Sequence, residues 1–388
     1  MRIAHLAWES LHSIAVGGLA VHVSEVTEAL AAGGDEIHVF TRSAPGHHHH
    51  EVVDGVHYHR LELPPGDDFL GQVAELNRRW VDEVFRVEDE AGPFDLVHAH
   101  DWLSADAMTW ITAGRPRRTV FTIHSTEYGR CGNNFYEGES ARIRQIERGG
   151  LHAADLVIAV SEALKTEIMW MYELADDQVT VIYNGVRAAR FTGPVDVEAA
   201  RAPYGVGPGD PMILFVGRLV GQKGPDLLLE AVPEVLEQFP TAAFIFTGDG
   251  YLLQSLEHRS VHLGVAGAVH FVGYTDDGEL ERLFKSCDVV CVPSRNEPFG
   301  IVVLEAWSAG KPVVASSAGG TDEFVDDGRN GVKVVPEPAA LAKGLLTVLG
   351  LDDRGRTMGL QGRADALDRF TWGAVARRTR AVYERLAA

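Results

Sequence analysis

Four charged side chains in the second half of the chain have the types and spacing of a site for a polar, anionic ligand. Glu297 and Glu305 are eight positions apart, about two turns of a helix, so both carboxylates can face one ligand at different depths. Arg218 and Lys223 are five positions apart and can hold a diphosphate without a metal ion, because cations donate charge-assisted hydrogen bonds to phosphate. The alternatives are a salt bridge for Glu305, a helix cap for Glu297 and two solvated cations.

Glycine-containing turns could bring backbone amides close to the same anion. The glycine pairs at 17–18 and 319–320 and the single Gly248 each follow an apolar run. Amides at the start of a helix favour anions, and glycine lets a ligand approach the backbone closely. A purely structural turn is the alternative for the pair at 17–18 and for Gly248.

The first half of the chain contributes histidines. The segments 98–102 and 123–128 close two predicted strands, and they contain His124, Asp101 and Tyr128. A histidine at the carboxyl end of a strand can donate to a hydroxyl group or carry a proton. A structural histidine with satisfied hydrogen bonds is the alternative for any one of these rings.

Apolar runs alternate with helical patterns along the chain, which is typical of βαβ units and a parallel sheet. The predicted strands of the first half are 2–8, 37–41, 96–100, 119–124, 156–160 and 179–183, and its predicted helices are 20–32, 69–89, 139–152 and 161–171. The predicted strands of the second half are 212–217, 243–247, 269–273, 289–293, 312–316 and 331–335. Open parallel sheets bind ligands at the carboxyl ends of their strands, where all of the motifs above lie.

The alternation is interrupted over residues 190–210, which are rich in proline and glycine and predict a linker. We therefore expect two domains, 1–190 and 191–371, and a last helix at about 372–388 that could pack back onto the first. The predicted fold class is α/β, with two Rossmann-like, doubly wound parallel sheets facing each other across a cleft.

Composition excludes several classes of function. The 35 cations and 55 anions give a net charge of −20, which disfavours nucleic acid and anionic membranes as partners. No apolar run is long enough for a transmembrane helix, and the first residues resemble a strand rather than a signal peptide, so we expect a cytoplasmic protein. The three cysteines form no CxxC pair and are expected to be reduced. Nothing in the sequence indicates the oligomeric state.

A run of four histidines occupies positions 47–50, beside a proline and a glycine. Its composition predicts a solvated loop, with adventitious metal binding as the alternative. It is far in sequence from the other candidates and receives no role.

Taken together, the glycine pair at 17–18, the Arg218-x4-Lys223 pair and the Glu297-x7-Glu305 element resemble the GT-B glycosyltransferases of family four and the related glycogen and starch synthases. The resemblance covers nearly the whole chain. It implies a retaining hexosyltransferase that uses a nucleotide-sugar, UDP- or ADP-glucose, as co-substrate and needs no metal or other cofactor. The first domain would serve the acceptor and the second the donor.

The resemblance also implies a role for each candidate residue. Glu297 and His124 would lie beside the transferred sugar, and Arg218 and Lys223 would bind the donor diphosphate. The donor would further be contacted by Gly18, Gly248, Phe299, Gly300, Glu305, Gly320 and Thr321, with Glu305 on the ribose. Asp101 and Tyr128 would lie on the acceptor side.

One departure from the family concerns the acceptor. Bacterial glycogen synthases carry a lysine before their glycine pair, and this chain has Ala15 and Val16 there. An α-glucan is the first expectation, since the segment 124–130 resembles shorter glycogen-synthase-like members. A small-molecule, sugar-phosphate or lipid acceptor is the alternative, and a nucleotide-sugar epimerase is a further one.

Overall fold

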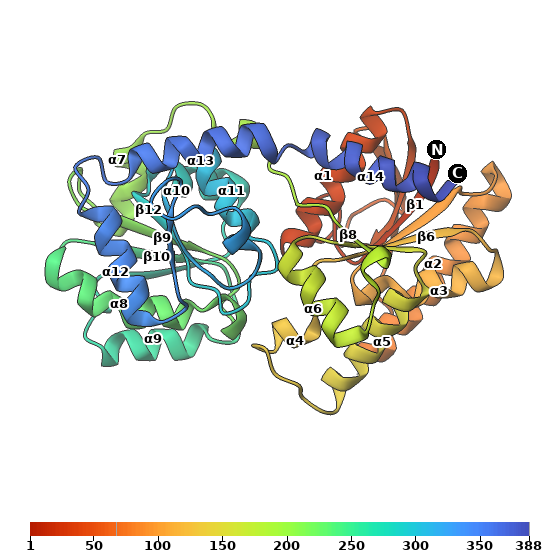
Figure 1. Cartoon of the computed structure of the whole chain (residues 1–388), viewed down its shortest axis with the longest axis horizontal. Coiled ribbons are helices and arrows are strands. Elements are labelled where there is room, and N and C mark those ends of the chain that lie inside the picture. The colour runs from red at the N-terminus through yellow and green to blue at the C-terminus, as the bar shows by residue number, and fades with distance from the viewer. Residues whose placement is uncertain (67, 388) are drawn as a thin grey trace. The chain divides into compact units, whose positions relative to one another are not determined.

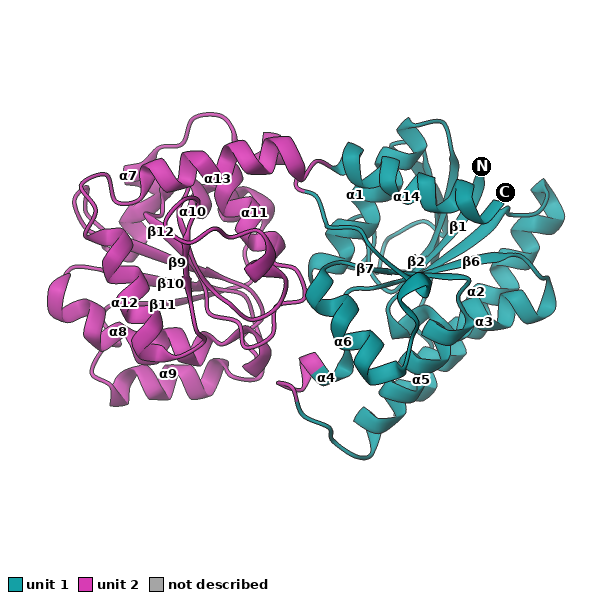
Figure 2. Ribbon diagram, viewed as in Figure 1, with its two compact units in different colours: residues 1–128, 134–185, 372–388 teal, residues 129–133, 186–371 magenta. Residues whose placement is uncertain are grey.

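The computed structural model describes residues 1–66 and 68–387, and the chain divides into two compact units (Figures 1 and 2). Unit 1 consists of Met1–Tyr128, Asn134–Gly185 and Trp372–Ala388, and unit 2 consists of Gly129–Asn133 and Val186–Thr371. Each unit contains one sheet with helices on its faces, as the predicted α/β class requires. In the described part of the chain, no helix combines the length and the hydrophobicity that crossing a membrane would demand.

The sheet of unit 1 has the strand order β3-β4-β2-β1-β5-β6-β7-β8, and only the β3–β4 pair is antiparallel. Its strands are β1 Arg2–Ala7, β2 Glu36–Arg42, β3 His50–Val53, β4 Val56–Leu61, β5 Leu96–His100, β6 Arg118–Ile123, β7 Leu156–Ala159 and β8 Val179–Val181. Most central residues of these strands are buried, because helices cover both faces of a parallel sheet.

The α-helices of unit 1 are α1 Gly18–Ala32, α2 Phe69–Ala91, α3 Ala105–Gly114, α5 Glu139–Ala153, α6 Glu162–Tyr172 and α14 Trp372–Ala387, and the short α4 Glu127–Arg130 spans the unit boundary. Local sequence explains their starts. The Asp68 carboxylate accepts a hydrogen bond from the Gly71 amide and caps α2, and the Ser161 hydroxyl accepts one from the Leu164 amide and caps α6.

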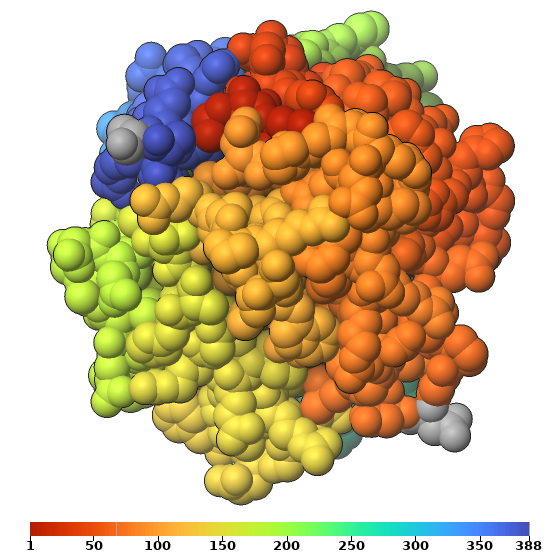
Figure 3. All heavy atoms as spheres, turned by 90° about the vertical axis from the view of Figure 1, so that its right-hand side faces the viewer, coloured from red at the N-terminus to blue at the C-terminus, as the bar shows by residue number. Residues whose placement is uncertain are grey.

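The C-terminal helix α14 belongs to unit 1 although the long segment Val186–Thr371 of unit 2 directly precedes it in sequence. Trp372, Val375 and Tyr383 are buried with Ile3 and Val23 in one apolar core cluster. Figure 3 shows a face of this unit on which the helix, in blue, lies beside the first residues of the chain, in red. Burial of apolar surface therefore joins the two ends of the chain.

The sheet of unit 2 is entirely parallel, in the order β11-β10-β9-β12-β13-β14. Its strands are β9 Met212–Val216, β10 Ala243–Thr247, β11 Val269–Gly273, β12 Val289–Val292, β13 Val313–Ser316 and β14 Val332–Val334. Its helices are α7 Val197–Arg201, α8 Pro225–Gln238, α9 Leu253–His262, α10 Asp277–Ser286, α11 Ile301–Ser308, α12 Pro338–Leu349 and α13 Arg356–Arg369.

Two local predictions differ from the structure. The segment 190–210 is a packed part of unit 2 rather than a linker, and it contains α7 and two short 3-10 helices. The expected domain boundary at 190/191 falls inside one of these, Ala188–Phe191. The histidine run is only partly a loop, because His50 begins β3 and pairs with His59 of β4.

The buried side chain of Arg201 explains why the segment 190–210 packs against the sheet. Its guanidinium donates to the Ser286 carbonyl at 2.8 Å and to the Asp288 carboxylate at 2.7 Å. Asp288 also accepts from the Met212 amide at the start of β9. One buried ion pair therefore joins the segment, the α10–β12 connection and the central strand.

We expect Arg201→Ala to lower the free energy of unfolding of unit 2 by about 3–5 kcal/mol, because it leaves a mostly buried carboxylate without its partner. Urea unfolding and calorimetry would measure this change in the free energy of unfolding. Arg354→Ala is the matched control, since Arg354 approaches the same carboxylate only at 3.7 Å and is more exposed; its loss should cost less than about 1 kcal/mol. Equal losses in both variants would contradict the packing role of Arg201.

Candidate active site

The carboxylate of Glu297 in unit 2 is buried and accepts three side-chain hydrogen bonds. It lies in the loop between β12 and α11 and is 4% exposed. Lys223 Nζ donates to both of its oxygens at 2.8 Å, and the Ser294 hydroxyl donates to Oε2 at 2.7 Å. Burying a carboxylate is costly unless it is paired and hydrogen-bonded, and these three bonds meet that need. The structure thus brings together two predicted residues, Glu297 and Lys223, and adds Ser294, which the prediction missed.

Backbone hydrogen bonds hold the Glu297 loop against the turn that follows β13. The Glu297 amide donates to the Ala318 carbonyl at 2.7 Å, and the Gly320 amide donates to the Glu297 carbonyl at 2.8 Å. Gly319 has a φ of +106°, and a Cβ there would lie 2.2 Å from the Glu297 carbonyl oxygen. Only glycine fits this approach. The Gly320 amide, predicted to contact the donor, is therefore already used inside the protein.

Three other residues that were predicted to contact the nucleotide-sugar are instead packed inside the protein, in and next to the Glu297 loop. The Thr321 hydroxyl donates to the Ser316 carbonyl at 2.7 Å, and Thr321 is buried. Gly300 has a φ of +104°, and a Cβ there would lie 2.7 Å from the Thr321 methyl group. The Phe299 ring is buried against Phe324, with centroids 5.1 Å apart. The Thr321 hydroxyl and the Phe299 ring thus support the loop rather than offer a contact to a ligand.

Arg218 follows β9, and its guanidinium donates to the Gln222 side-chain oxygen at 3.3 Å. The backbone carbonyl of Gln222 accepts from the Arg295 amide at 2.8 Å, so the loops that carry the cations and Glu297 are joined. Arg295, also missed by the sequence prediction, forms a two-pronged ion pair with Asp226 at 2.8 and 2.6 Å. The sequence feature that could have indicated Arg295 is its position two residues before Glu297.

Gly248 directly follows β10 and allows two loops at the same end of the sheet to touch. Its φ is +126°, and a Cβ there would lie 2.1 Å from the Gly217 carbonyl oxygen. The Leu219 amide donates to the Asp249 carbonyl at 2.8 Å beside it. This contact gives Gly248 a structural role next to the Arg218 loop.

Glu305 lies in the second turn of α11 and is partly buried. Burial raises the pKa of its carboxyl to about 7; Arg190 opposes this shift and Asp277 adds to it. Arg190, which the sequence analysis did not select, pairs with Asp277 at 2.9 Å and with Glu281 at 3.4 Å. The two glutamates of the motif therefore differ, since Glu297 has a direct cationic partner and Glu305 lies in a less polar environment.

In unit 1, the glycine pair at the start of α1 faces a carboxylate of the same chain. The amides of Val16 and Gly17 both donate to Glu9 Oε2 at 3.1 Å, and Gly18 is the first residue of the helix. Burial raises the pKa of Glu9, and the hydrogen bonds from Val16 and Gly17 and the charge of Arg42 lower it. The Gly17 amide of the predicted glycine pair thus already binds a carboxyl group inside the protein, while Gly18, the predicted donor contact, begins the helix. Glu9 is a residue that the spacing of the motifs did not indicate.

His124 directly follows β6, and Asp101 directly follows β5. The Asp101 carboxylate accepts from the His124 amide at 2.7 Å. Asp101 has a φ of +57°, which is uncommon for a residue other than glycine and marks a conformation imposed by its surroundings. Asp101, predicted to lie on the acceptor side, thus positions the backbone of His124.

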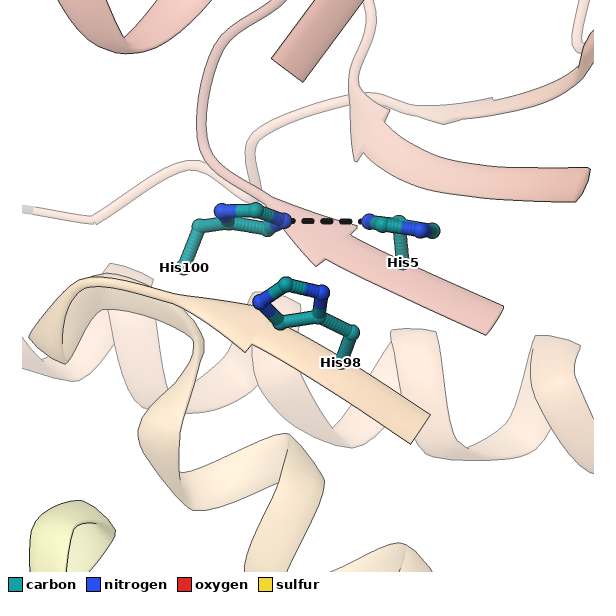
Figure 4. Close-up of side chains that lie close together, drawn as sticks. All are labelled: His5, His98 and His100. Atoms are coloured by element: carbon teal, nitrogen blue, oxygen red, sulfur yellow. Dashed lines mark hydrogen bonds between the residues drawn. The ribbon is translucent and has the colours of Figure 1, made fainter. Parts of the chain in front are cut away.

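Five histidines form a connected cluster at this edge of unit 1: His5, His22, His98, His100 and His124. His5 Nδ1 and His100 Nε2 are 3.0 Å apart, and His100 Nδ1 and His124 Nε2 are 3.3 Å apart (Figure 4 shows His5, His98 and His100). His98 Nδ1 lies 2.6 Å from the Tyr383 hydroxyl of α14. Burial lowers the pKa of His5 and of His124 to about 3, and it holds the pKa of the other three well below the usual range. All five rings are therefore neutral near pH 7.

Tyr128, the second predicted acceptor residue, belongs to an aromatic group on the surface of unit 1. Its ring lies 4.8 Å from that of Phe135 and 5.7 Å from that of Trp170. Phe135 and Trp170 are 57% and 61% exposed. We call Tyr128, Phe135 and Trp170 the aromatic patch. Exposed aromatic patches of this kind mark binding surfaces.

The raised pKa of Glu305 predicts how stability depends on pH. Between its ordinary pKa of 4.5 and the native value of about 7, the native state keeps a proton that the unfolded state has lost. The contribution of Glu305 to the free energy of unfolding therefore falls as the pH rises through this window. Glu305→Gln should remove that fall in urea unfolding measured from pH 4.5 to 8. Glu198→Gln, at an exposed position of α7, should follow the wild type. A Glu305→Gln curve parallel to that of the wild type would contradict the shift.

Comparisons with known proteins agree with this architecture. The model of the family "Glycosyltransferase Family 4" matches residues 16–190, and that of "Glycosyl transferases group 1" matches residues 196–365. The chain is similar to an uncharacterized glycosyltransferase of Methanocaldococcus jannaschii, with 34% identity over 99% of this chain and 98% of the relative. It is also similar to a glycogen synthase of Mycobacterium tuberculosis, with 31% identity over 99% and 94%.

Two further similarities broaden the range of named activities. A D-inositol 3-phosphate glycosyltransferase of Nocardia farcinica is 32% identical over 93% of this chain and 83% of the relative. Among solved structures, sucrose-phosphate synthase from Thermosynechococcus elongatus superimposes with a TM-score of 0.84 at 26% identity, covering 99% of this chain and 98% of the other. Whole-chain similarity at this level, together with two Rossmann-like parallel-sheet units, shows that the chain belongs to the GT-B glycosyltransferases of family 4.

Proposed function

We propose that the protein transfers glucose from UDP- or ADP-glucose to a hydroxyl group of an α-glucan, with retention of the anomeric configuration. In this proposal unit 2 binds the donor, unit 1 serves the acceptor, and no divalent cation is required. The observation that carries the proposal is the buried Glu297–Lys223 pair, set among the carboxyl ends of β9, β12 and β13 with Arg218 on the adjoining loop.

The charges of this group suit the departure of a nucleoside diphosphate. The ammonium group of Lys223 has three N–H donors, and it donates to both oxygens of Glu297. Because the Lys223 side chain is 24% exposed, its remaining donor can reach a phosphate oxygen. Arg218 can add a second cation. Fixed donors of this kind stabilise charge that develops as a bond breaks, which is the work that a metal ion does in other transferases.

Glu297 supplies the opposite charge. Its carboxylate is held by Lys223 and Ser294, so it is oriented before any ligand binds. Beside the transferred sugar it would stabilise the positive charge of an oxocarbenium-like transition state. The acceptor oxygen would attack from the side that the diphosphate leaves, and the departing phosphate oxygen would take the hydroxyl proton. The configuration at the anomeric carbon is then retained without a covalent enzyme nucleophile.

Glu305 suits the ribose of the donor. A carboxylate on a largely apolar helix needs a hydrogen-bonding partner when it is ionised, and a ribose diol offers two hydroxyl donors. The pKa of about 7 implies that this carboxyl is easily protonated while the ribose is absent.

The aromatic patch supports a carbohydrate acceptor. Flat aromatic side chains offer sugar rings an apolar face, and Tyr128 stands only four residues after His124. The relative named glycogen synthase favours an α-glucan. The relative named D-inositol 3-phosphate glycosyltransferase favours a sugar-phosphate or cyclitol-phosphate acceptor as the second candidate.

The decisive experiment combines donors and acceptors in one panel. We expect UDP- or ADP-glucose, rather than GDP-sugars, to raise the melting temperature, and NMR of the product with an α-glucan to show a new α-linkage. EDTA should leave the rate unchanged.

Arg218→Ala should lower kcat roughly 10²–10³-fold, the scale of losing one preorganised donor. Transfer only to phosphorylated acceptors would select the second candidate, and isomerised donor without acceptor would establish an epimerase.

Trp170→Ala tests the acceptor side. Loss of one stacking side chain should raise KM for a long α-glucan roughly 3–10-fold, because aromatic contacts contribute about 0.5–1.5 kcal/mol, and should leave KM for the donor unchanged. Steady-state kinetics with glucans of different lengths would measure this. Trp110→Ala on α3, whose ring packs with Arg78, is the matched control. An unchanged glucan KM in Trp170→Ala would remove the aromatic patch from the acceptor site.

A further inference from the structure

Three histidines of unit 1 have the arrangement of a metal site. His22 lies in the second turn of α1, His100 is the last residue of β5, and His124 follows β6. One side-chain nitrogen from each of the three lies within 4.8 Å of the other two. The three elements belong to the same unit, and His22 and His100 are buried while His124 is partly exposed.

The spacing matches a tetrahedral ion. Zinc binds histidine nitrogen at about 2.0–2.1 Å, which separates two ligand nitrogens by about 3.3 Å and their ring centres by about 5 Å. His100 Nδ1 and His124 Nε2 are 3.3 Å apart. The ring centres of the three histidines are 4.5, 5.5 and 5.6 Å apart.

The remaining nitrogens of two of these rings have partners that orient them. His22 Nδ1 lies 2.7 Å from the Asn184 side-chain oxygen, an acceptor, so Nδ1 carries the proton and Nε2 is the metal-binding atom. His100 Nε2 lies 3.0 Å from His5 Nδ1, and His5 Nε2 lies 3.4 Å from the Tyr383 hydroxyl. Metal-binding histidines are commonly held in this way through their second nitrogen.

The neighbouring group of His5, His98 and His100 also meets the distance condition, but it fits a supporting role better. Both nitrogens of His98 are engaged at 2.6 Å, by the Tyr383 and Thr122 hydroxyls. A metal ion there would have to replace these hydrogen bonds. In Figure 4 the dashed line joins His5 to His100. This hydrogen bond orients the ring of His100 toward the site formed with His22 and His124.

We propose that His22, His100 and His124 bind a divalent ion of the Zn²⁺ type and that the ion inhibits transfer by occupying His124. Three neutral imidazoles with one open position are a donor set that Zn²⁺ and Co²⁺ accept. The binding site stands on the geometry alone. Its inhibitory effect rests on the proposed function, in which His124 lies beside the transferred sugar. Metal would then be unnecessary for catalysis and unfavourable to it.

The first test measures binding without any activity. The full chain, freed of metal with a chelator and dialysed, is titrated with Co²⁺ and followed by its visible absorption, and with Zn²⁺ by calorimetry. We expect one strong site with the intense absorption of tetrahedral Co²⁺. In the wild type labelled with ¹⁵N-histidine, Zn²⁺ should shift His100 Nδ1 and the Nε2 atoms of His22 and His124. Absence of a strong site, or shifts at other histidines, would overturn the proposal.

Matched variants separate this site from its neighbours. His22→Gln should weaken binding at least 100-fold, and Asn184→Ala should weaken it 10–100-fold, the usual effect of losing a partner that orients a ligand. His98→Gln should retain strong binding, because His98 is not a ligand of the proposed site. If the ion instead bound to His5, His98 and His100, this substitution would weaken binding. If a variant does not fold, the ¹⁵N shifts that Zn²⁺ causes in the wild-type protein identify the ligand nitrogens instead. If His47→Ser with His48→Ser removes the strong site instead, binding belongs to the surface run and the proposal is wrong.

The inhibitory effect is read separately. Stoichiometric Zn²⁺ should lower the transfer rate of the wild type at least tenfold, and EDTA should restore it. In His22→Gln the same Zn²⁺ concentration should leave that variant's own rate unchanged. Strong binding with an unaffected rate would retain the metal site and refute inhibition. A protein that binds the ion and transfers no sugar would refute the proposed function instead.

Discussion

All strands of a parallel sheet end at one edge, and the candidate site depends on this constraint in both units. In unit 2 the loops after β9, β12 and β13 bring together Lys223, Glu297 and Gly320, although Lys223 and Gly320 are far apart in the sequence. In unit 1 the same rule places His100, the last residue of β5, beside His124, which follows β6. Adjacent strands supply neighbouring side chains, so residues far apart in sequence become partners without long excursions of the chain.

Glu297 shows how such loops become rigid. A buried charge needs donors, and it obtains them from Lys223 on the β9 loop and Ser294 on its own loop. The backbone of the same residue is joined to the turn after β13 through Ala318 and Gly320. Side-chain electrostatics and backbone hydrogen bonds thus fix one residue from three directions. Such orientation before ligand binding is what makes a charged group effective in catalysis.

Much of this architecture could be predicted, because buried parallel strands are continuous apolar runs. Strands β5, β10 and β11 have the predicted limits, and the other predicted strands differ by one or two residues at an end. Strands β3 and β4 were missed because β3 is a short, exposed edge strand and β4 has histidine and arginine among its apolar residues. The supposed linker 190–210 was misread because glycine and proline content cannot show that Arg201 is buried.

The structure brings two of the predicted site residues, Glu297 and Lys223, into contact, but most contacts of the candidate residues could not be predicted from the sequence. Glu297 and Lys223 could be selected by type and spacing, but their mutual ion pair requires the sheet register. The internal bonds of Gly320 and Thr321 and the burial of Phe299 depend on how two loops pack. Glu9 and Asn184 carry no spacing signal at all, since each acts through one partner brought close by the fold.

The return of α14 to unit 1 has a consequence for biosynthesis. Unit 2 ends at Thr371, so a ribosome has made all of it before the last helix of unit 1 exists. Until then Tyr383 is missing, and the rings of His5 and His98 lack the hydroxyl that lies between them. Domains generally fold as units during synthesis, from the N-terminal end onward. Here the unit that begins first is completed after the other, and its histidine cluster gains the hydrogen bonds of Tyr383 only once all of unit 2 has been made.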